Sequence, residues 1–222
     1  MYVQWFGQSA FLLRDDATTV FVDPFGSAEA LGARAMRWDY PAIADVDADL
    51  LLITHEHFDH NNAAAVGGDP AVIRSTAGRI DSPVGEVVAV ASEHDQAAGT
   101  QRGPNSVFVF TLGGLRVCHM GDFGQAALRD EQAEAIGAVD VLFAPVGAGP
   151  TIGPEQAAGI ATALGARIVV PMHYRTAAID FLDPVDPFLA LYGDATRLET
   201  PSFETSEIEP GSPRVVVPAP PG

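Results

Sequence analysis

The stretch THEHFDH, residues 54–60, holds three of the six histidines of this 222-residue chain. It directly follows an apolar run that is typical of a buried strand. In an extended segment, side chains at positions i, i+2 and i+4 share a face, so His55, His57 and Asp59 are expected to converge. His60 adds a ligand where the chain turns. Imidazole and carboxylate groups bind Zn²⁺, Mn²⁺ and Fe²⁺, so the stretch predicts a metal site rather than an accidental polar loop.

Four ligands from one short loop cannot fill two coordination spheres, so further ligands must come from elsewhere in the chain. Three other apolar runs end in residues of the right type: His94-Asp95, Asp122 and His173. Each lies where a predicted strand stops and a loop begins, which is where functional sites are commonly built. The sequence therefore predicts that several strand ends meet around the metal site.

The order of apolar runs predicts an α/β chain with two sheets covered by helices. Strands are expected over 3–6, 11–13, 19–22, 50–54, 72–75, 87–91, 107–111, 115–120, 139–145 and 168–170, and helices over 123–136 and 154–164. Residues 29–38 are ambiguous and could form a short helix. We expect a single domain over 1–222, in which the Pro-rich tail 201–222 adds a late edge strand at 214–217 and then frays.

The composition limits the classes of molecule that the protein is expected to bind. All 12 basic residues are arginine, and the net charge is −17. Such a charge repels polyphosphate strands and anionic membranes, so we expect a small-molecule substrate, no nucleic acid and no membrane insertion. Cys118 is the single cysteine, which fits a reducing compartment, and the N-terminus lacks a basic leader, so a cytoplasmic location is expected.

Several motifs in a fixed order resemble the metallo-β-lactamase fold superfamily over residues 2–185. They are Val22-Asp23-Pro24, the 54–60 stretch, His94-Asp95, Gly121-Asp122 and Pro171-Met172-His173-Tyr174. The segments GTQRGPNSVFVF (99–110) and APVGAGPTIGPEQA (144–157) look like its small metal-dependent hydrolases. That subgroup includes L-ascorbate-6-phosphate lactonase-like and N-acylphosphatidylethanolamine-hydrolysing relatives.

The resemblance implies an αββα sandwich of two mixed sheets flanked by helices, with two divalent metal ions at one edge. Zn²⁺ is favoured, with Mn²⁺ or Fe²⁺ as alternatives. The implied ligands are His55, His57 and His94 for the first ion, Asp59, His60 and His173 for the second, and Asp122 as a bridge between them. Asp23 would orient a ligand imidazole, and an Asx turn before Pro24 is the less favoured alternative.

Two segments depart from the family pattern. Gly7-Gln8-Ser9 stands where many relatives have a histidine beside the glycine. Residues 30–43 match no part of the pattern, and segments of this kind often shape substrate pockets. The sequence therefore leaves the identity of the substrate open.

The function that this pattern predicts is hydrolysis of an ester, lactone, amide or phosphodiester by a hydroxide that bridges two metal ions. Asp59 and Asp122 would be the catalytic carboxylates, with Asp59 able to accept a proton. A di-iron oxidoreductase of the same fold is an alternative, but its second ligand is typically glutamate and here it is His57. A non-catalytic metal-binding sensor is disfavoured because all seven ligand positions are intact.

Arg102, Asn105 and Tyr174 lie beside the predicted ligand loops and are candidate substrate contacts. Turn structure is the simpler explanation for the first two, and ring packing for the third.

The choice between His94 and His119 as a metal ligand follows from strand alternation. His119 and Asp122 have opposite parity on what reads as one strand, so their side chains are expected on opposite faces unless Gly121 breaks the pattern. His94 lies just past a strand end and can turn toward the site. We therefore predict that His94 is the ligand.

Overall fold

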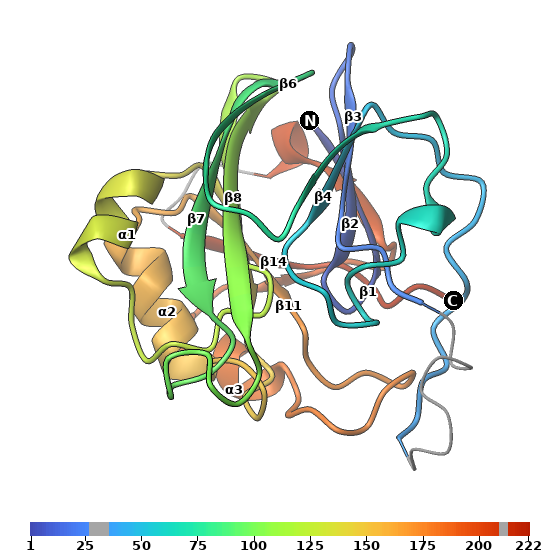
Figure 1. Ribbon diagram of the computed structural model, residues 1–222. Helices are drawn as coiled ribbons and strands as arrows, with labels where there is room; N and C mark the ends of the chain where they lie inside the picture. The colour runs from blue at the N-terminus through green and yellow to red at the C-terminus, as the bar shows by residue number, and fades with distance from the viewer. Residues whose placement is uncertain (27–35, 209–212) are drawn as a thin grey trace.

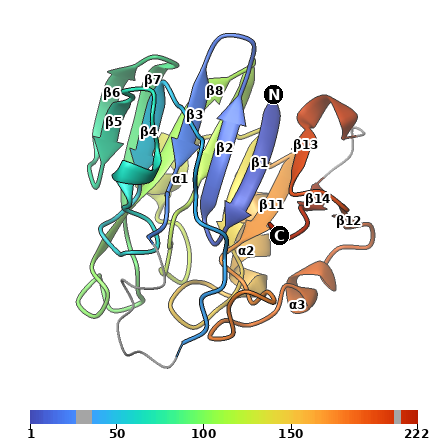
Figure 2. The same ribbon diagram turned by 90° about the vertical axis from the view of Figure 1, so that its right-hand side faces the viewer.

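Two mixed sheets pack face to face in a computed structural model that describes residues 1–26, 36–208 and 213–222 (Figures 1 and 2). The six-stranded sheet has the order β13 (Ser202–Glu204), β1 (Tyr2–Gly7), β2 (Ala10–Arg14), β3 (Thr19–Val22), β4 (Leu50–Ile53) and β5 (Ala71–Arg74). The eight-stranded sheet has the order β12 (Thr196–Arg197), β14 (Arg214–Val217), β11 (Ile168–Met172), β10 (Val141–Pro145), β9 (Leu115–His119), β8 (Pro104–Leu112), β7 (Gly85–Glu93) and β6 (Gly78–Ser82).

The helices are short. They are α1 (Asp130–Ile136), α2 (Pro154–Ala163), α3 (Asp186–Leu189) and the 3₁₀ turns η2 (Ala63–Ala65) and η3 (Thr205–Glu207). Figure 1 shows α1 and α2 against the outer face of the eight-stranded sheet. Within the described residues, no helix has the length and apolarity that a membrane crossing requires.

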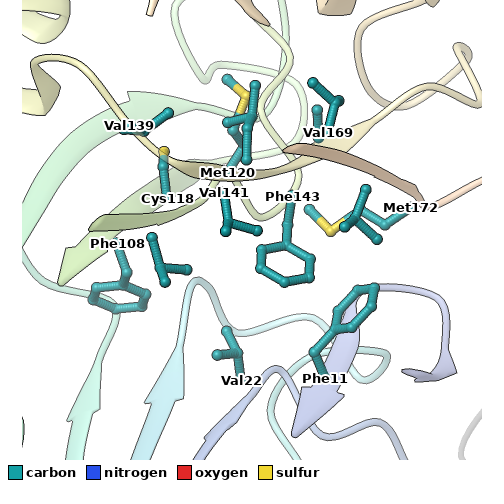
Figure 3. Packing of buried hydrophobic residues seen from close by; sticks show 14 of the residues in the cluster. Phe11, Val22, Phe108, Cys118, Met120, Val139, Val141, Phe143, Val169 and Met172 are labelled. Atoms are coloured by element: carbon teal, nitrogen blue, oxygen red, sulfur yellow. The ribbon is translucent and has the colours of Figure 1, made fainter. Parts of the chain in front are cut away.

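The main core fills the space between the two sheets. In Figure 3, Phe11 and Val22 from the six-stranded sheet face Phe108, Val141 and Phe143 from the eight-stranded sheet. The Phe11 and Phe143 ring centroids are 4.6 Å apart. Several strands are buried on both faces. This explains why their sequences are continuous apolar runs and do not alternate between apolar and polar residues.

A second cluster covers the outer face of the six-stranded sheet. Phe21 and Leu51 of the sheet belong to it, together with Trp38 and Tyr40. This gives part of the unmatched segment 30–43 a packing role. A short helix was considered over residues 29–38. Residues 29–35 lie outside the described residues, and residues 36–38 are not helical. The αββα expectation is thus confirmed, and the described part of this outer layer consists of loops and the 3₁₀ turn η2.

The prediction of a helix over 123–136 is wrong for its first half. Helix α1 begins only at Asp130. The preceding segment is held by other contacts: Gly124 donates its N–H to the carbonyl of Glu93 at 2.9 Å, and the Gln125 amide accepts from the Glu93 N–H at 3.1 Å. A β-carbon at Gly124 would lie 2.4 Å from the backbone of His94. The chain is therefore pinned against the His94 loop, in competition with helix formation.

The predicted edge position of strand 214–217 is also wrong, because β14 pairs with β12 on one side and β11 on the other. The short strand β12 carries no long apolar run, so its sequence did not reveal it. Helix α2 agrees with the expected 154–164 to within one residue, where Pro154 occupies the first turn that suits proline.

Strand direction brings the predicted ligands to one edge. β3 and β4 are parallel, as are β9, β10 and β11. β7 is antiparallel to β8, and β8 to β9, so β7 runs in the same direction as β9. β3 and β4 therefore end at one edge of the six-stranded sheet, and β7, β9, β10 and β11 end at one edge of the eight-stranded sheet, whereas β8 runs the opposite way. The Ser106 N–H of β8 donates to the Thr54 carbonyl at 3.0 Å, which ties the two sheets together there.

Candidate metal centre

The seven predicted ligands and Asp23 lie together at this shared edge, each just after a strand. Asp23 follows β3, residues 55–60 follow β4, His94 follows β7, Asp122 follows β9, and His173 follows β11. All except His57 are buried. The fold thus collects polar side chains from five strand ends into one small volume.

The first group of side chains is His55, His57 and His94. One ring nitrogen from each lies within 4.8 Å of the others. His55 Nε2 is 3.0 Å from His57 Nδ1, and the rings of His57 and His94 have centroids 5.0 Å apart. Three imidazoles at this spacing form a three-nitrogen set open toward one side, as in many zinc sites.

The second group is Asp59, His60, Asp122 and His173, whose ligand atoms also lie within 4.8 Å of one another. His60 Nε2 is 3.2 Å from Asp122 Oδ1, and His173 Nε2 is 3.2 Å from Asp122 Oδ2. The Asp59 Oδ2 atom is 3.7 Å from His60 Nε2 and 4.0 Å from His173 Nε2. The group therefore offers two carboxylate oxygens and two imidazole nitrogens.

Asp122 also contacts the first group. Its Oδ2 atom lies 3.0 Å from His94 Nε2 and 3.9 Å from His55 Nε2. One carboxylate therefore faces ring nitrogens of both groups. This is the geometry that a ligand shared between two ions requires.

Unsatisfied atoms test whether these residues fit a metal. His60 Nε2 and Asp122 Oδ1 are buried and have no hydrogen-bond partner among the described residues. A buried polar atom without a partner costs free energy, and native proteins rarely tolerate it. Nitrogen and oxygen donors in this arrangement suit Zn²⁺, Mn²⁺ or Fe²⁺, so the residues fit divalent ions.

Burial and charge set the protonation of the group. Burial lowers the pKa of His55 far below its usual value and also lowers the pKa of His57, so both rings are neutral. Burial alone would raise the pKa of Asp122, but His173, His60 and His94 hold it well below its usual range. His55, His57 and Asp122 are thus in the forms that bind a metal. Asp122 instead raises the pKa of His60 and of His94 despite their burial, so these two rings would release a proton when a metal binds.

Asp23 occupies the place of a residue that orients a ligand. Its Oδ2 atom lies 2.8 Å from His60 Nδ1, and its carboxylate accepts from the Thr54 N–H and Oγ1–H, each at 2.8 Å. The backbone of Asp23 has φ 52°, a left-handed conformation that aspartate and asparagine adopt more readily than most residues. With Nδ1 bonded to Asp23, His60 directs Nε2 at the site.

Asp23→Asn is expected to weaken metal binding about 10- to 100-fold, because an amide cannot accept from both Thr54 and His60 as the carboxylate does. Asparagine keeps the left-handed backbone, so the fold is retained. Metal titration with a competing chromophoric chelator measures the change. The matched control is Asp45→Asn, at an exposed aspartate with φ 56°; equal affinity in both variants would contradict the role of Asp23.

Three further groups around the ligands were not assigned to the site from the sequence. The Pro150 carbonyl lies 2.9 Å from His94 Nδ1, and Thr54 Oγ1 lies 3.0 Å from His55 Nδ1. The Gln8 amide donates to Asp59 Oδ2 at 3.2 Å. The only sequence signal for these was the departure at Gln8, because a backbone carbonyl 56 residues from its histidine leaves no pattern.

His119 does not join either ligand group. Its Nε2 donates to the Ser9 carbonyl at 3.0 Å, and its Nδ1 accepts from the Gly121 N–H at 3.2 Å. The ring packs between Phe11 and Phe143 in the core. Both ring nitrogens are occupied by backbone groups. The alternation argument does not account for this, because β9 ends at His119 and Gly121 has φ 55°, which breaks the strand pattern before Asp122.

The three candidate substrate contacts lie in different environments. Arg102 lines a cavity of about 930 Å³ that also exposes His57, His94 and Asp122. Asn105 is buried, and its amide serves the protein: Oδ1 accepts from the Asp122 N–H at 3.0 Å, and Nδ2 donates to the Met120 carbonyl at 2.9 Å. Asn105 therefore positions the Asp122 loop.

Tyr174 faces away from the metal-site cavity. Its ring lies against Trp5, with centroids 5.4 Å apart. It lines a smaller pocket together with Arg175 and Arg197. The packing interpretation fits this residue, so we do not propose it as a substrate contact.

The sequence of this chain is similar to those of known proteins. The family model for the beta-lactamase superfamily domain matches residues 2–173. A UPF0173 metal-dependent hydrolase of Geobacillus sp. is 30% identical, over 87% of this chain and 94% of that protein. Another, from Thermococcus kodakarensis, is 30% identical over 88% and 94%.

Solved structures agree with the sequence relatives. A metallo-β-lactamase superfamily protein of Thermotoga maritima superposes with a TM-score of 0.78 at 34% identity, covering 97% of both chains. A metal-dependent hydrolase fold from Parabacteroides distasonis gives a TM-score of 0.65 at 19% identity, which speaks for the fold alone. The narrower resemblance to lactonase-like and phospholipase-like relatives stays a prediction.

Proposed function

The chain belongs to the metallo-β-lactamase superfamily, among its metal-dependent hydrolases, and from this premise we propose that it hydrolyses a small molecule with two divalent metal ions. The bond would be an ester, lactone, amide or phosphodiester. The observation that carries the proposal is the position of Asp122, whose carboxylate lies within 3.2 Å of ring nitrogens in both ligand groups.

Each ligand group would hold one ion. His55, His57 and His94 supply the first set, Asp59, His60 and His173 the second, and Asp122 belongs to both. Bound ions of this kind polarise a substrate oxygen and lower the pKa of water to about 7. Zn²⁺ is the ion we propose, because imidazole and carboxylate ligands suit it.

The protein's own groups keep the ligands in place. Asp23, Thr54 and the Pro150 carbonyl each contact the ring nitrogen that faces away from the site, in His60, His55 and His94 respectively. Each of these contacts fixes a ring orientation before substrate arrives.

Asp59 is the group best placed to hold a proton during the reaction. Its side chain lines the cavity and keeps a small exposed fraction of 12%, unlike the buried Asp122. Gln8 donates to one of its oxygens at 3.2 Å, which leaves the other oxygen available to a substrate. A carboxylate in this position can accept a proton and return it to a leaving group.

The cavity and the net charge support a small substrate. A cavity of about 930 Å³ is within the range that small ligands occupy. The net charge of −17 opposes polyanions such as nucleic acids. Substrates of this proposal are therefore small esters, lactones, amides or phosphodiesters rather than polymers.

Removal of the metal is expected to lower hydrolysis at least about a hundredfold, because the ions supply several kcal/mol of transition-state stabilisation. The protein is treated with a chelator, desalted and assayed on a panel of lactones, phosphodiesters and thioesters. Zn²⁺ or Mn²⁺ is then added back, and metal content is measured alongside activity. Two ions per chain and restored turnover support the proposal; undiminished activity in metal-free protein contradicts it.

A further inference from the structure

Arg102 differs from the other arginines of this acidic chain. Among the residues that the structure describes, every other arginine pairs with a carboxylate, donates to a backbone carbonyl or, in the case of Arg14, lies over an aromatic ring. The Arg102 guanidinium has no such partner in this part of the chain. Arg102 is exposed, so its guanidinium is accessible to a ligand that enters from solvent.

Arg102 lies where two cavities adjoin. It lines the metal-site cavity beside His57 and His94, and it also lines a second pocket of about 390 Å³ with Ala91 and Pro104. A molecule whose reacting bond is at the metal ligands therefore has Arg102 within its reach on one side. The second pocket offers mostly apolar walls to the rest of that molecule.

The backbone at Arg102 is fixed by the loop that starts at the ligand His94. The next residue, Asp95, accepts hydrogen bonds from the N–H groups of Ala97, Gly99, Gln101 and Arg102 at 2.7–3.0 Å. Asp95 thereby directs its carboxylate to the backbone and leaves the Arg102 side chain unneutralised. The loop holds the backbone of Arg102 at a set place relative to the metal ligands.

Glu56 is an acidic residue that lines both cavities, and its carboxylate already has partners of its own. Its carboxylate accepts from both arms of Arg74 and from the Ser75 hydroxyl, and Arg74 lowers the Glu56 pKa to about 2. Glu56 is therefore a satisfied carboxylate that does not need Arg102.

We propose that Arg102 binds an anionic oxygen group of the substrate, a carboxylate or a phosphate, at a distance from the bond that is hydrolysed. A guanidinium presents a planar fork that matches both groups. An anion repelled by the rest of the protein would find here the local positive charge it requires. The inference deepens the proposed hydrolysis and rests on it, since it names a class of substrate.

The test compares two esters that differ in charge, 3-carboxyphenyl acetate and 3-acetylphenyl acetate, with Zn²⁺-loaded protein. The variants are Arg102→Gln and Arg102→Lys. The control is Arg79→Gln, which removes an equal charge from strand β6, where Arg79 pairs with Glu86. Calorimetry measures binding of 3-hydroxybenzoate, 3-hydroxyphenyl phosphate and the neutral 3-hydroxyacetophenone to the same proteins.

We expect the wild type to favour the charged ester, and Arg102→Gln to lower kcat/KM for that ester about tenfold, the size of one charge-assisted contact. The neutral ester should change less than about twofold, and Arg102→Lys should fall between, since it keeps the charge but not the fork. Affinity for the anionic phenols should fall in parallel. Whichever of carboxylate and phosphate loses more identifies the anion.

Equal losses for charged and neutral compounds, or anion affinity unchanged by Arg102→Gln, would overturn the role of Arg102. The second result would mean that the anions bind the metal ions instead. If the wild type hydrolyses neither ester, the proposed hydrolysis fails for these esters, while the binding data still decide whether Arg102 recognises an anion. The two failures are therefore distinguishable.

Discussion

Asp122→Asn is expected to empty both metal positions and to lower turnover about a thousandfold, equivalent to about 4 kcal/mol of transition-state stabilisation. The reason is the position of the carboxylate, with Oδ2 3.0 Å from His94 Nε2 and Oδ1 3.2 Å from His60 Nε2. An amide has nearly the same shape but no charge, and it cannot offer two anionic oxygens to two ions. The fold should survive, because the Asn105 side chain accepts from the backbone N–H of residue 122 and not from its side chain.

Metal analysis and turnover on the same preparation measure this effect. Asp81→Asn, at an exposed position on β6, controls for the loss of one negative charge. A variant that kept two ions and wild-type turnover would show that Asp122 does not connect the two ligand groups. Loss of one ion alone would assign Asp122 to a single group.

His94→Ala is expected to lose the metal of the first ligand group together with activity, whereas His119→Ala should keep both metals. His94 directs Nε2 at Asp122, while its Nδ1 is fixed by the Pro150 carbonyl. His119 is fully buried and bonded through both nitrogens to backbone groups. Its removal should instead lower the free energy of unfolding by about 2–4 kcal/mol, from a cavity and an unpaired Ser9 carbonyl.

Metal content measured side by side, with denaturant unfolding of the metal-free proteins, separates the two effects. His94→Ala should unfold nearly as the wild type does in the absence of metal, and His119→Ala should unfold at lower denaturant. Metal loss in His119→Ala but not in His94→Ala would reverse the assignment.

The agreement between sequence and structure is best where the signal is local. The run Leu50–Ile53 is fully buried, and a continuous apolar segment of that length has few alternatives to a core strand. The 54–60 stretch then follows a strand of known direction. The expectation that His55, His57 and Asp59 share one face was correct only for the two histidines. Residues 55–60 form bends and turns rather than an extended segment, and Asp59 joins His60 in the second group.

Two other predictions have a different basis. His119 was expected to lie away from the ligands, but the strand alternation used for this does not reach Asp122, because β9 ends at His119 and Gly121 has φ 55°. The αββα architecture and the order of the ligands came from the resemblance of ordered motifs, which carries information that periodicity alone does not.

Other features depended on contacts between segments far apart in the chain. The helix expected over 123–136 lost its first half because residues 124 and 125 bond to Glu93. The local sequence pattern does not reveal that competition, because the same side chains are compatible with a helix and with the observed irregular segment. Strand β14 is not at the edge of its sheet, because the two-residue strand β12 pairs with it. Strand β12 is too short to leave a periodic signal in the sequence.

The sequence by itself determined the kinds of candidate ligand and most of the strands, because these depend on residue type and local spacing. The exclusion of polyanionic partners stays a prediction from the net charge. Only the tertiary structure decided that Asn105 supports the Asp122 loop, and that Arg102 borders the cavity without a counterion among the described residues. The physical reason is that hydrogen bonds and ion pairs act over a few ångströms in space. Which carboxylate contacts which partner therefore depends on how the strand ends are arranged in the folded chain.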